Sequence, residues 1–266
     1  MNPLINFLKR VAAYRAVIGL MALRTIQYRY AGTLAGMAWS FLQPLMMILV
    51  YWLVFSVGFK LQPAQNIPFI VMFLCGLIPW AMFHETLTAN VQAITGNPHL
   101  VKKTVFPTEI LPVVNLAASF ISHGIMLVIL AVILIWNRIP FSWHNLQFLY
   151  YLLALSIFSL GLSWFLSALN VFYRDTSQIL SVLLNLWFWL TPVVWMSDLL
   201  PAHLRPFIQL NPIYYIIEGY RSSFIYHEPF WHHGGLGLYF WGVSSLALIA
   251  GGMIFRRLKP EFADEL

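Results

Sequence analysis

Long apolar stretches separated by short polar links dominate the pattern of this chain. From Tyr30 to Phe59, for example, the sequence contains no Asp, Glu, Lys, Arg or His. As an α-helix this run would be about 45 Å long, at a rise of about 1.5 Å per residue. That length exceeds the hydrocarbon core of a bilayer, which is roughly 30 Å thick. The pattern therefore predicts transmembrane helices.

Six stretches are long and apolar enough to cross a membrane. We expect these spans at residues 35–58, 68–92, 111–136, 146–169, 178–197 and 235–255. Hydrophobic residues make up 60% of the chain and charged residues only 9%, whereas about a quarter of the residues in soluble domains are charged. The sequence thus predicts an all-α polytopic membrane protein with six transmembrane helices. Spans 1–5 occupy residues 35–197, and residues 235–266 contain span 6 and a short tail.

The first 34 residues are basic and moderately amphipathic. Five Lys or Arg residues occur there, and the apolar run between Arg15 and Arg24 is too short to cross a membrane. For residues 1–34 we expect a helix that lies in the headgroup plane at the cytoplasmic surface, with apolar side chains towards the lipid. A solvated cytoplasmic helix is the alternative.

Residues 198–234 are apolar but interrupted. Pro201, Pro206, Pro212 and Gly219 divide the segment into short pieces, which cannot cross a membrane alone. Non-helical backbone at membrane depth must be covered by protein or line a water-filled cavity. We therefore expect two short re-entrant or periplasmic helices between spans 5 and 6.

The distribution of Lys and Arg predicts the orientation. Six spans place both termini on one side of the membrane, and that side carries eleven of the 15 Lys and Arg residues. The other links carry four, which are Lys60, Arg138, Arg205 and Arg221. Because cytoplasmic loops are enriched in these residues, we expect both termini in the cytoplasm. The formal net charge of +6 then reflects orientation and does not indicate a nucleic-acid partner.

Motifs for nucleotide and metal chemistry are absent from the sequence. It contains neither the GxxxxGK[ST] phosphate loop nor GxGxxG, so energy from ATP would have to come through a partner. The His and Glu residues between positions 227 and 233 fit no standard metal-site spacing. His84 and Glu85 are the only neighbouring ionisable pair within a span, and consecutive helical residues point about 100° apart. We expect no catalytic residue, no metal and no cofactor in this chain.

Aromatic side chains are the most abundant candidates for binding. Trp and Tyr concentrate at membrane interfaces in any case, but rings that face a wet lumen could stack on sugar faces. The candidate channel-lining residues are Trp39, Tyr51, Trp80, Phe83, Trp187 and Trp189.

Six loose motifs occur in a specific order along nearly the whole chain. They are RYAGTLAGMAWSFLQP (29–44), KKTVFPTEILP (102–112), NVFYRD (170–175), LTPVVW (190–195), NPIYYIIEGYR (211–221) and FRRLKPEFAD (255–264). In this order the motifs resemble those of the membrane (permease) subunit of type 2 ABC exporters for cell-surface polysaccharides. The O-antigen export branch is the nearest match, and capsule or teichoic acid permeases are the alternatives.

This resemblance implies partners, a substrate and a location. A single permease domain, residues 1–266, would form a homodimer in the bacterial inner membrane and bind two ATP-binding cassette subunits, which hold ATP and Mg. The substrate would be an undecaprenyl-diphosphate-linked glycan that moves outward. An integral membrane transferase acting on lipid-linked sugars and a passive pore remain the alternatives from other classes.

The resemblance also implies roles for individual residues. Coupling to the ATPase would involve Lys102, Lys103, Glu109, Arg174 and Asp175. The residues that resemble the family's periplasmic gate are Pro212, Tyr214, Tyr215, Glu218 and Arg221. Arg24 and Arg29 are candidates for the lipid diphosphate at the cytoplasmic entrance, because planar guanidinium groups suit phosphate; simple anchoring at the cytoplasmic surface is the alternative.

Overall fold

A computed structural model describes residues 3–60, 67–103, 106–197 and 200–266, and these ranges contain helices and no strand. The predicted link between spans 1 and 2 falls largely outside the described residues, because positions 61–66 are not among them. Positions 104–105 of the motif at 102–112 and positions 198–199 of the interrupted segment also lie outside.

Five of the helical stretches in the described residues are long and apolar enough to cross a membrane. They are Gly36–Gly58, Phe69–Val91, Thr108–Trp136, Trp143–Phe172 and Gly234–Glu265. Their main helices are α3 (Trp39–Trp52), α4 (Phe69–Val91), α6 (Leu111–Trp136), α7 (Phe148–Phe172) and α11 (Gly234–Leu258). They match predicted spans 1–4 and 6 to within a few residues at most ends, which confirms a multi-pass helical membrane protein.

The predicted fifth span differs from the structure. Helix α8 (Thr176–Leu190) ends at Leu190 instead of continuing to residue 197. Thr191 has extended backbone angles, as expected for a residue before proline, whose ring disfavours the helical conformation of its predecessor. At about 1.5 Å per residue, α8 is shorter than a bilayer core, so a sixth crossing stays a prediction.

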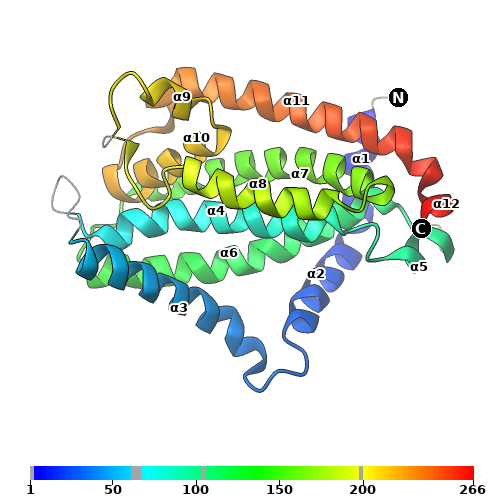
Figure 1. Ribbon diagram of the computed structural model, residues 1–266, viewed down its shortest axis with the longest axis horizontal. Coiled ribbons are helices and arrows are strands. Elements are labelled where there is room, and N and C mark those ends of the chain that lie inside the picture. Colours follow the sequence, from blue (N-terminus) through cyan, green and yellow to red (C-terminus); the bar gives the residue numbers. More distant parts are fainter. Residues whose placement is uncertain (1–2, 61–66, 104–105, 198–199) are drawn as a thin grey trace.

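Helix α4 lies at the centre of the bundle (Figure 1) and packs against α6, α7, α8 and α10 (Pro212–Arg221). Most of its side chains are buried, including Phe73, Leu74 and Phe83. By contrast, α3 buries only Ile48 and lies at the edge of the bundle. The long core cluster therefore forms around α4, and α3 forms a loosely covered side wall.

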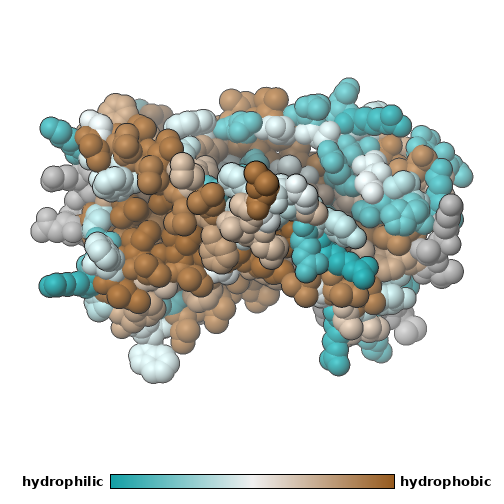
Figure 2. Space-filling model, turned by 90° about the horizontal axis from the view of Figure 1, so that it is seen from below, coloured by the Kyte–Doolittle hydropathy of each residue, from teal (hydrophilic) through white to brown (hydrophobic). Residues whose placement is uncertain are grey.

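Both chain termini lie at one end of the bundle, together with α1 (Pro3–Ala13), α5 (Pro98–Lys103) and α12 (Phe262–Glu265) (Figure 1). We call this the terminal end, and the end that holds α9 (Arg205–Gln209) and α10 the distal end. Seen from below, hydrophobic residues spread over the middle of the molecule and hydrophilic residues gather towards the terminal end (Figure 2).

The described part of the N-terminal segment contains two helices, Pro3–Ala13 and Arg15–Arg29, where the sequence suggested one. The second helix, α2 (Arg15–Arg29), buries Ile18, Ala22 and Ile26. These residues recur every four positions and face α6, where Val114 and Ala118 are their buried neighbours. One apolar face of α2 is therefore covered by α6, whereas Val17, Leu20 and Leu23 are exposed, and the interfacial position of α2 stays a prediction.

The interrupted segment contains two short α-helices in the described part of the chain, α9 and α10, followed by the helical turns Ser222–Tyr226 and Phe230–His233. Pro206 and Pro212 lie at the starts of α9 and α10, as predicted, but Gly219 lies inside α10 and does not end it. Helix α10 is almost completely buried and contacts α4, α7 and α11. Its depth in a membrane, and with it the re-entrant geometry, stays a prediction.

Helices α7 and α11 approach closely where two glycines meet. A Cβ added at Gly161 would lie 2.5 Å from the backbone N of Leu248, and one at Gly251 would overlap the carbonyl O of Gly161. Small residues at such contacts let helix backbones come together in membranes.

We predict that Gly251→Ala lowers the stability of the purified protein by about 1–3 kcal/mol, because overpacking forces the two backbones apart. Thermal unfolding in detergent would measure the effect. Gly242→Ala is the matched control on the same helix, since nothing lies within 4 Å of the added Cβ. Equal unfolding temperatures of the two variants would contradict the close packing of α7 on α11.

Candidate functional site

A cavity of about 700 Å³ lies among α3, α4, α6 and α8. We call it the lateral pocket, because α3 at the edge of the bundle forms one of its walls. Most of its lining is apolar. Its polar side chains come from five helices and include Arg29, Gln43, His84, Glu85, Ser122 and Asn185.

An ion pair lies at the edge of the lateral pocket. Arg29, at the end of α2, donates from Nη1 to Oε1 of Glu85 on α4 over 2.7 Å. The same carboxylate oxygen accepts from Ser122 Oγ on α6 over 3.0 Å. The side chains of Arg29 and Glu85 are 35% and 21% exposed, so the arginine is held in place and still open to the pocket.

Of the two arginines predicted for the entrance, only Arg29 lines the lateral pocket. Arg24 is exposed on α2. Five positions correspond to about 500° around a helix, so the two side chains point about 140° apart. The helix periodicity alone could have shown that the two arginines do not share one site.

The predicted aromatic residues divide into three groups. Tyr51, Trp80 and Trp189 line the lateral pocket. Phe83 and Trp187 lie behind them and contact each other edge to face, with ring centroids 5.2 Å apart. Trp39 is exposed at the start of α3 and does not belong to the pocket lining. Contact of any of these rings with a substrate stays a prediction.

Asn211 joins the end of α8 to the start of α10. Its Oδ1 accepts from Trp187 Nε1 over 2.8 Å and from the backbone N of Ile213 over 3.0 Å. Its Nδ2 donates to Thr191 Oγ1 over 2.7 Å. Sequence analysis missed this residue, although Asn followed by Pro is a recognisable helix start, with Asn as the N-cap and Pro as the first helical residue.

The residues predicted for a gate lie on α10. Pro212 is its first residue, and Tyr214 and Tyr215 are buried. Tyr215 shares a hydrogen bond of 3.1 Å with Tyr150 of α7. Arg221 is 2% exposed; it pairs with Glu218 at 2.8 Å and donates to the carbonyl O of Pro192 over 2.7 Å. Helix α10 is thus firmly held in this conformation.

At the terminal end, Glu109 joins three separate parts of the chain. Its carboxylate pairs with Arg10 of α1 and with Lys259 Nζ of the C-terminal tail, the latter at 2.5 Å. Its backbone carbonyl accepts from Trp164 Nε1 of α7 over 3.2 Å. We call this arrangement the Glu109 clamp. Its partners lie 99 and 150 positions away, which explains why sequence analysis named Glu109 without them.

The other residues predicted for coupling also lie at the terminal end. Lys102 is exposed on α5, and Arg174 and Asp175 are exposed in the turn between α7 and α8. Helix α12 contacts both α5 and α7, so it bridges the two segments. The side chain of Lys103 lies outside the described part of the structure.

The ionisable residues near the distal end form no metal-ligand cluster in the part of the chain that the structure describes. His232 lies 3.4 Å from Glu228, and both side chains are largely exposed. His227 faces the ring of His144 at a centroid distance of 6.4 Å.

Apolar helices of membrane-spanning length with a partly polar pocket between them are typical of a multi-pass membrane protein, and the family match assigns it to the transport subunits. Residues 16–225 match the family described as ABC-2 type transporter. The chain belongs to this family, which confirms the resemblance found in the sequence.

Curated relatives match nearly the full chain. The O-antigen export system permease protein RfbA of Myxococcus xanthus is 31% identical over 99% of this chain and 100% of its own length. Two proteins of the same description from Klebsiella pneumoniae are 29% and 28% identical, each over 91% of this chain and 92% of its own length.

We predict that Asn211→Ala lowers stability by about 1–3 kcal/mol, because it leaves buried partners without their hydrogen bonds. The unfolding temperature of the purified chain is the measurement. Asn137→Ala is the control, since Asn137 is the C-cap of α6 and its side chain donates to the carbonyl O of Ile133 in the same helix. If the two variants unfold at the same temperature, Asn211 does not fix α10 to α8.

Proposed function

We propose that this chain is the channel-forming subunit of an ATP-driven exporter that moves lipid-linked polysaccharide, most specifically undecaprenyl-diphosphate-linked O-antigen, out across the bacterial inner membrane. The observation that carries this proposal is the match to O-antigen export permeases over nearly the whole chain. The relatives' description favours O-antigen over capsule or teichoic acid.

ATP would be hydrolysed by a partner. The sequence has no phosphate loop, and membership of the ABC-2 family supports pairing with two ATP-binding cassette subunits, which bind ATP and Mg. The terminal end would face the cytoplasm, because it holds Lys9, Arg10, Arg256, Arg257 and Lys259 and cytoplasmic segments are rich in such residues.

The terminal end offers a surface for the ATPase. Lys102, Arg174 and Asp175 are exposed there, so their charges are free to meet a partner. Glu109 is engaged by Arg10 and Lys259, and we assign it the role of bracing the segment that carries α5. A rigid, braced segment can transmit closure of the ATPase to α6 and α7 without deforming.

The lateral pocket would be one half of the translocation path, and a second copy of the chain would supply the other half. Tyr51, Trp80 and Trp189 line it, and aromatic faces can stack on sugars without holding them tightly. Helix α10, with its buried tyrosines, would close the outer end.

Arg29 would bind the diphosphate of the substrate. It lies at the edge of the lateral pocket, and a guanidinium can donate two parallel hydrogen bonds to phosphate. Glu85 occupies that guanidinium in the structure, so the incoming diphosphate would displace a carboxylate. Arg24 points elsewhere, and we assign it the anchoring role at the membrane surface.

The exporter proposal predicts that an ATP-binding cassette subunit accompanies this protein when it is purified from its native membranes. We expect equal numbers of the two chains by quantitative mass spectrometry, and vesicles containing the complex should transport lipid-linked O-antigen only when ATP is present. A chain that purifies alone and modifies a lipid-linked sugar by itself would contradict the proposal and favour a membrane transferase.

If Arg29 binds the diphosphate, substitutions of Arg29 and of Glu85 should change the apparent affinity for the substrate in opposite directions. Arg29→Gln should raise the concentration of lipid-linked substrate that half-maximally stimulates ATP hydrolysis by about tenfold, since a hydrogen bond to a charged group contributes about 1.5–3 kcal/mol. Glu85→Gln should lower that concentration, because the diphosphate then has no carboxylate to displace.

Arg24→Gln is the matched control on α2 and should leave the half-maximal concentration unchanged. If Arg29 only fixes α2 to α4, Glu85→Gln should impair the protein in the same direction as Arg29→Gln. That result would assign the pair to structure alone.

A further inference from the structure

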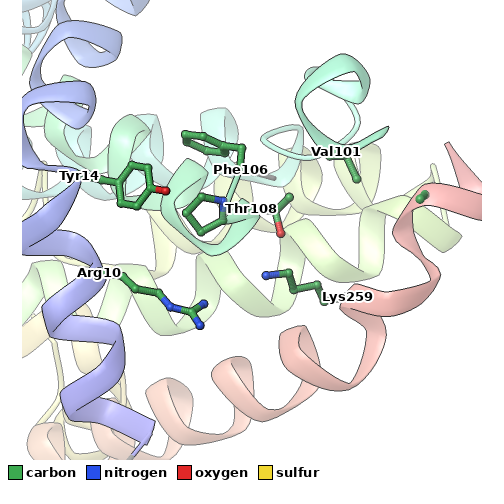
Figure 3. A pocket seen from close by; sticks show the side chains of 8 residues that line it. Arg10, Tyr14, Val101, Phe106, Thr108 and Lys259 are labelled. Carbon is green, nitrogen blue, oxygen red and sulfur yellow. The ribbon is translucent and has the colours of Figure 1, made fainter. Parts of the chain in front are cut away.

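A second cavity, of about 460 Å³, lies at the terminal end, apart from the lateral pocket. It is formed by α1, the segment 106–108, α5 and the C-terminal tail. Arg10 and Lys259 approach it from opposite sides, and Tyr14 and Thr108 complete its polar lining (Figure 3). We call it the terminal cavity.

The charges around the terminal cavity do not cancel. Arg10 and Lys259 both pair with the carboxylate of Glu109, which leaves two positive charges against one negative charge in this cluster. The side chains of Arg10 and Lys259 are 55% and 36% exposed, whereas that of Glu109 is 15% exposed. The cations are therefore more accessible than the acid, and the cluster can accept a further anion.

Thr108 supplies a buried donor without an acceptor. The residue is 4% exposed, and its Oγ1 has no hydrogen-bond partner among the described residues. Figure 3 shows this hydroxyl directed towards the side of the cavity that holds Lys259. A buried hydroxyl without a partner costs about 1–3 kcal/mol, so binding of a ligand oxygen that accepts a hydrogen bond from it would be favourable.

Tyr14 points its hydroxyl towards the same space (Figure 3). Its ring is held edge to face against Phe106, with centroids 6.0 Å apart. Two cations and two hydroxyl groups thus surround one cavity, and all four can donate hydrogen bonds.

We propose that the terminal cavity is a phosphate-binding site. A phosphate group presents only acceptor oxygens and carries negative charge, which matches two cationic and two hydroxyl donors. The position at the end of the bundle, beside the basic helix α1, favours the phosphate of an anionic phospholipid; a soluble phosphate compound has the same chemistry. Phosphate binding here does not rest on the export function proposed above, although it uses the two cations that hold Glu109.

The carboxylate of Glu109 would compete with the bound phosphate for the two cations of this site. This carboxylate holds Arg10 and Lys259 when the cavity is empty, and a bound phosphate shares these cations with it. Glu109 lies just before α6, and its backbone carbonyl accepts a hydrogen bond from Trp164 Nε1. The phosphate would therefore be bound next to the start of α6.

The test measures binding of phosphatidylglycerol to the purified, delipidated full-length chain by native mass spectrometry, with phosphatidylcholine as the reference lipid. Thr108→Val replaces the hydroxyl by a methyl group of the same size. We expect it to weaken phosphatidylglycerol binding about fivefold, the equivalent of one neutral hydrogen bond. Arg10→Gln should weaken it about tenfold, the equivalent of a charged one, and Glu109→Gln should strengthen it.

Lys9→Gln is the control, because Lys9 is exposed on the same helix and does not line the cavity. Its binding should equal that of the unchanged chain. A parallel titration with inorganic phosphate identifies the source: a response that Thr108→Val removes would support the site with a soluble ligand.

The opposite results would overturn the proposal. If the hydroxyl of Thr108 has no ligand, Thr108→Val should stabilise the chain and leave all binding unchanged, since it removes an unpaired buried group. If Glu109→Gln weakens binding as Arg10→Gln does, the cluster serves only to hold the tail. Equal binding of the two lipids would likewise exclude a phospholipid site, and no response to inorganic phosphate would then exclude phosphate binding altogether.

Discussion

A helix that ends inside an apolar bundle leaves backbone carbonyl groups that need hydrogen-bond donors, and this requirement organises the distal half of the molecule. Helix α8 ends at Leu190, and Thr191 and Pro192 continue in a non-helical conformation among buried residues. Backbone groups that are buried in this way need donors from the protein or from a water-filled cavity. In the last turn of α8, Thr191 donates from Oγ1 to the carbonyl O of Trp187 over 2.6 Å. Beyond the helix end, Arg221 donates from Nη2 to the carbonyl O of Pro192 over 2.7 Å.

The break after α8 is held at two points of α10. Asn211, at the start of that helix, binds Thr191 and Trp187, and Arg221, at its end, binds Pro192. Gly76 of α4 completes the arrangement, because a Cβ there would lie 3.0 Å from the carbonyl O of Val193. Any displacement of α10 must therefore move the end of α8 with it, and this ties the residues of the predicted gate to a wall of the lateral pocket.

The sequence predicted most of the helices because backbone satisfaction in lipid leaves few choices. Long apolar runs such as 68–92 must be helical, and the structure places α4 there. Prediction was wrong about the end of span 5, where the apolar run continues through Trp195 but Pro192 had already ended the helix. The prediction followed the long apolar run and ignored Pro192, which is a local signal for the end of a helix.

The site was less predictable, because its pairs join distant positions. Arg29 and Glu85 are 56 residues apart, and the sequence around either residue does not indicate that the other is its partner. The separation of Arg24 from Arg29 around α2 and the capping role of Asn211 follow from local geometry, and sequence analysis could have found both. The placement of Trp80 in the pocket lining and of Phe83 behind it depends on how α4 turns in the bundle, which requires the structure.

The exposed face of α3 does not by itself require a partner, because lipid chains cover apolar residues as well as protein does. The polar side chains of the lateral pocket give a stronger reason to expect a partner. Arg29 and Glu85 lie beside α3, which itself contributes Gln43 to the pocket, and charged groups facing lipid are costly. Water in an enclosed channel would satisfy these groups, and a single chain leaves the α3 side of the bundle uncovered. Closure by a second copy of the chain would remove the conflict, in agreement with the second copy that the proposed translocation path calls for.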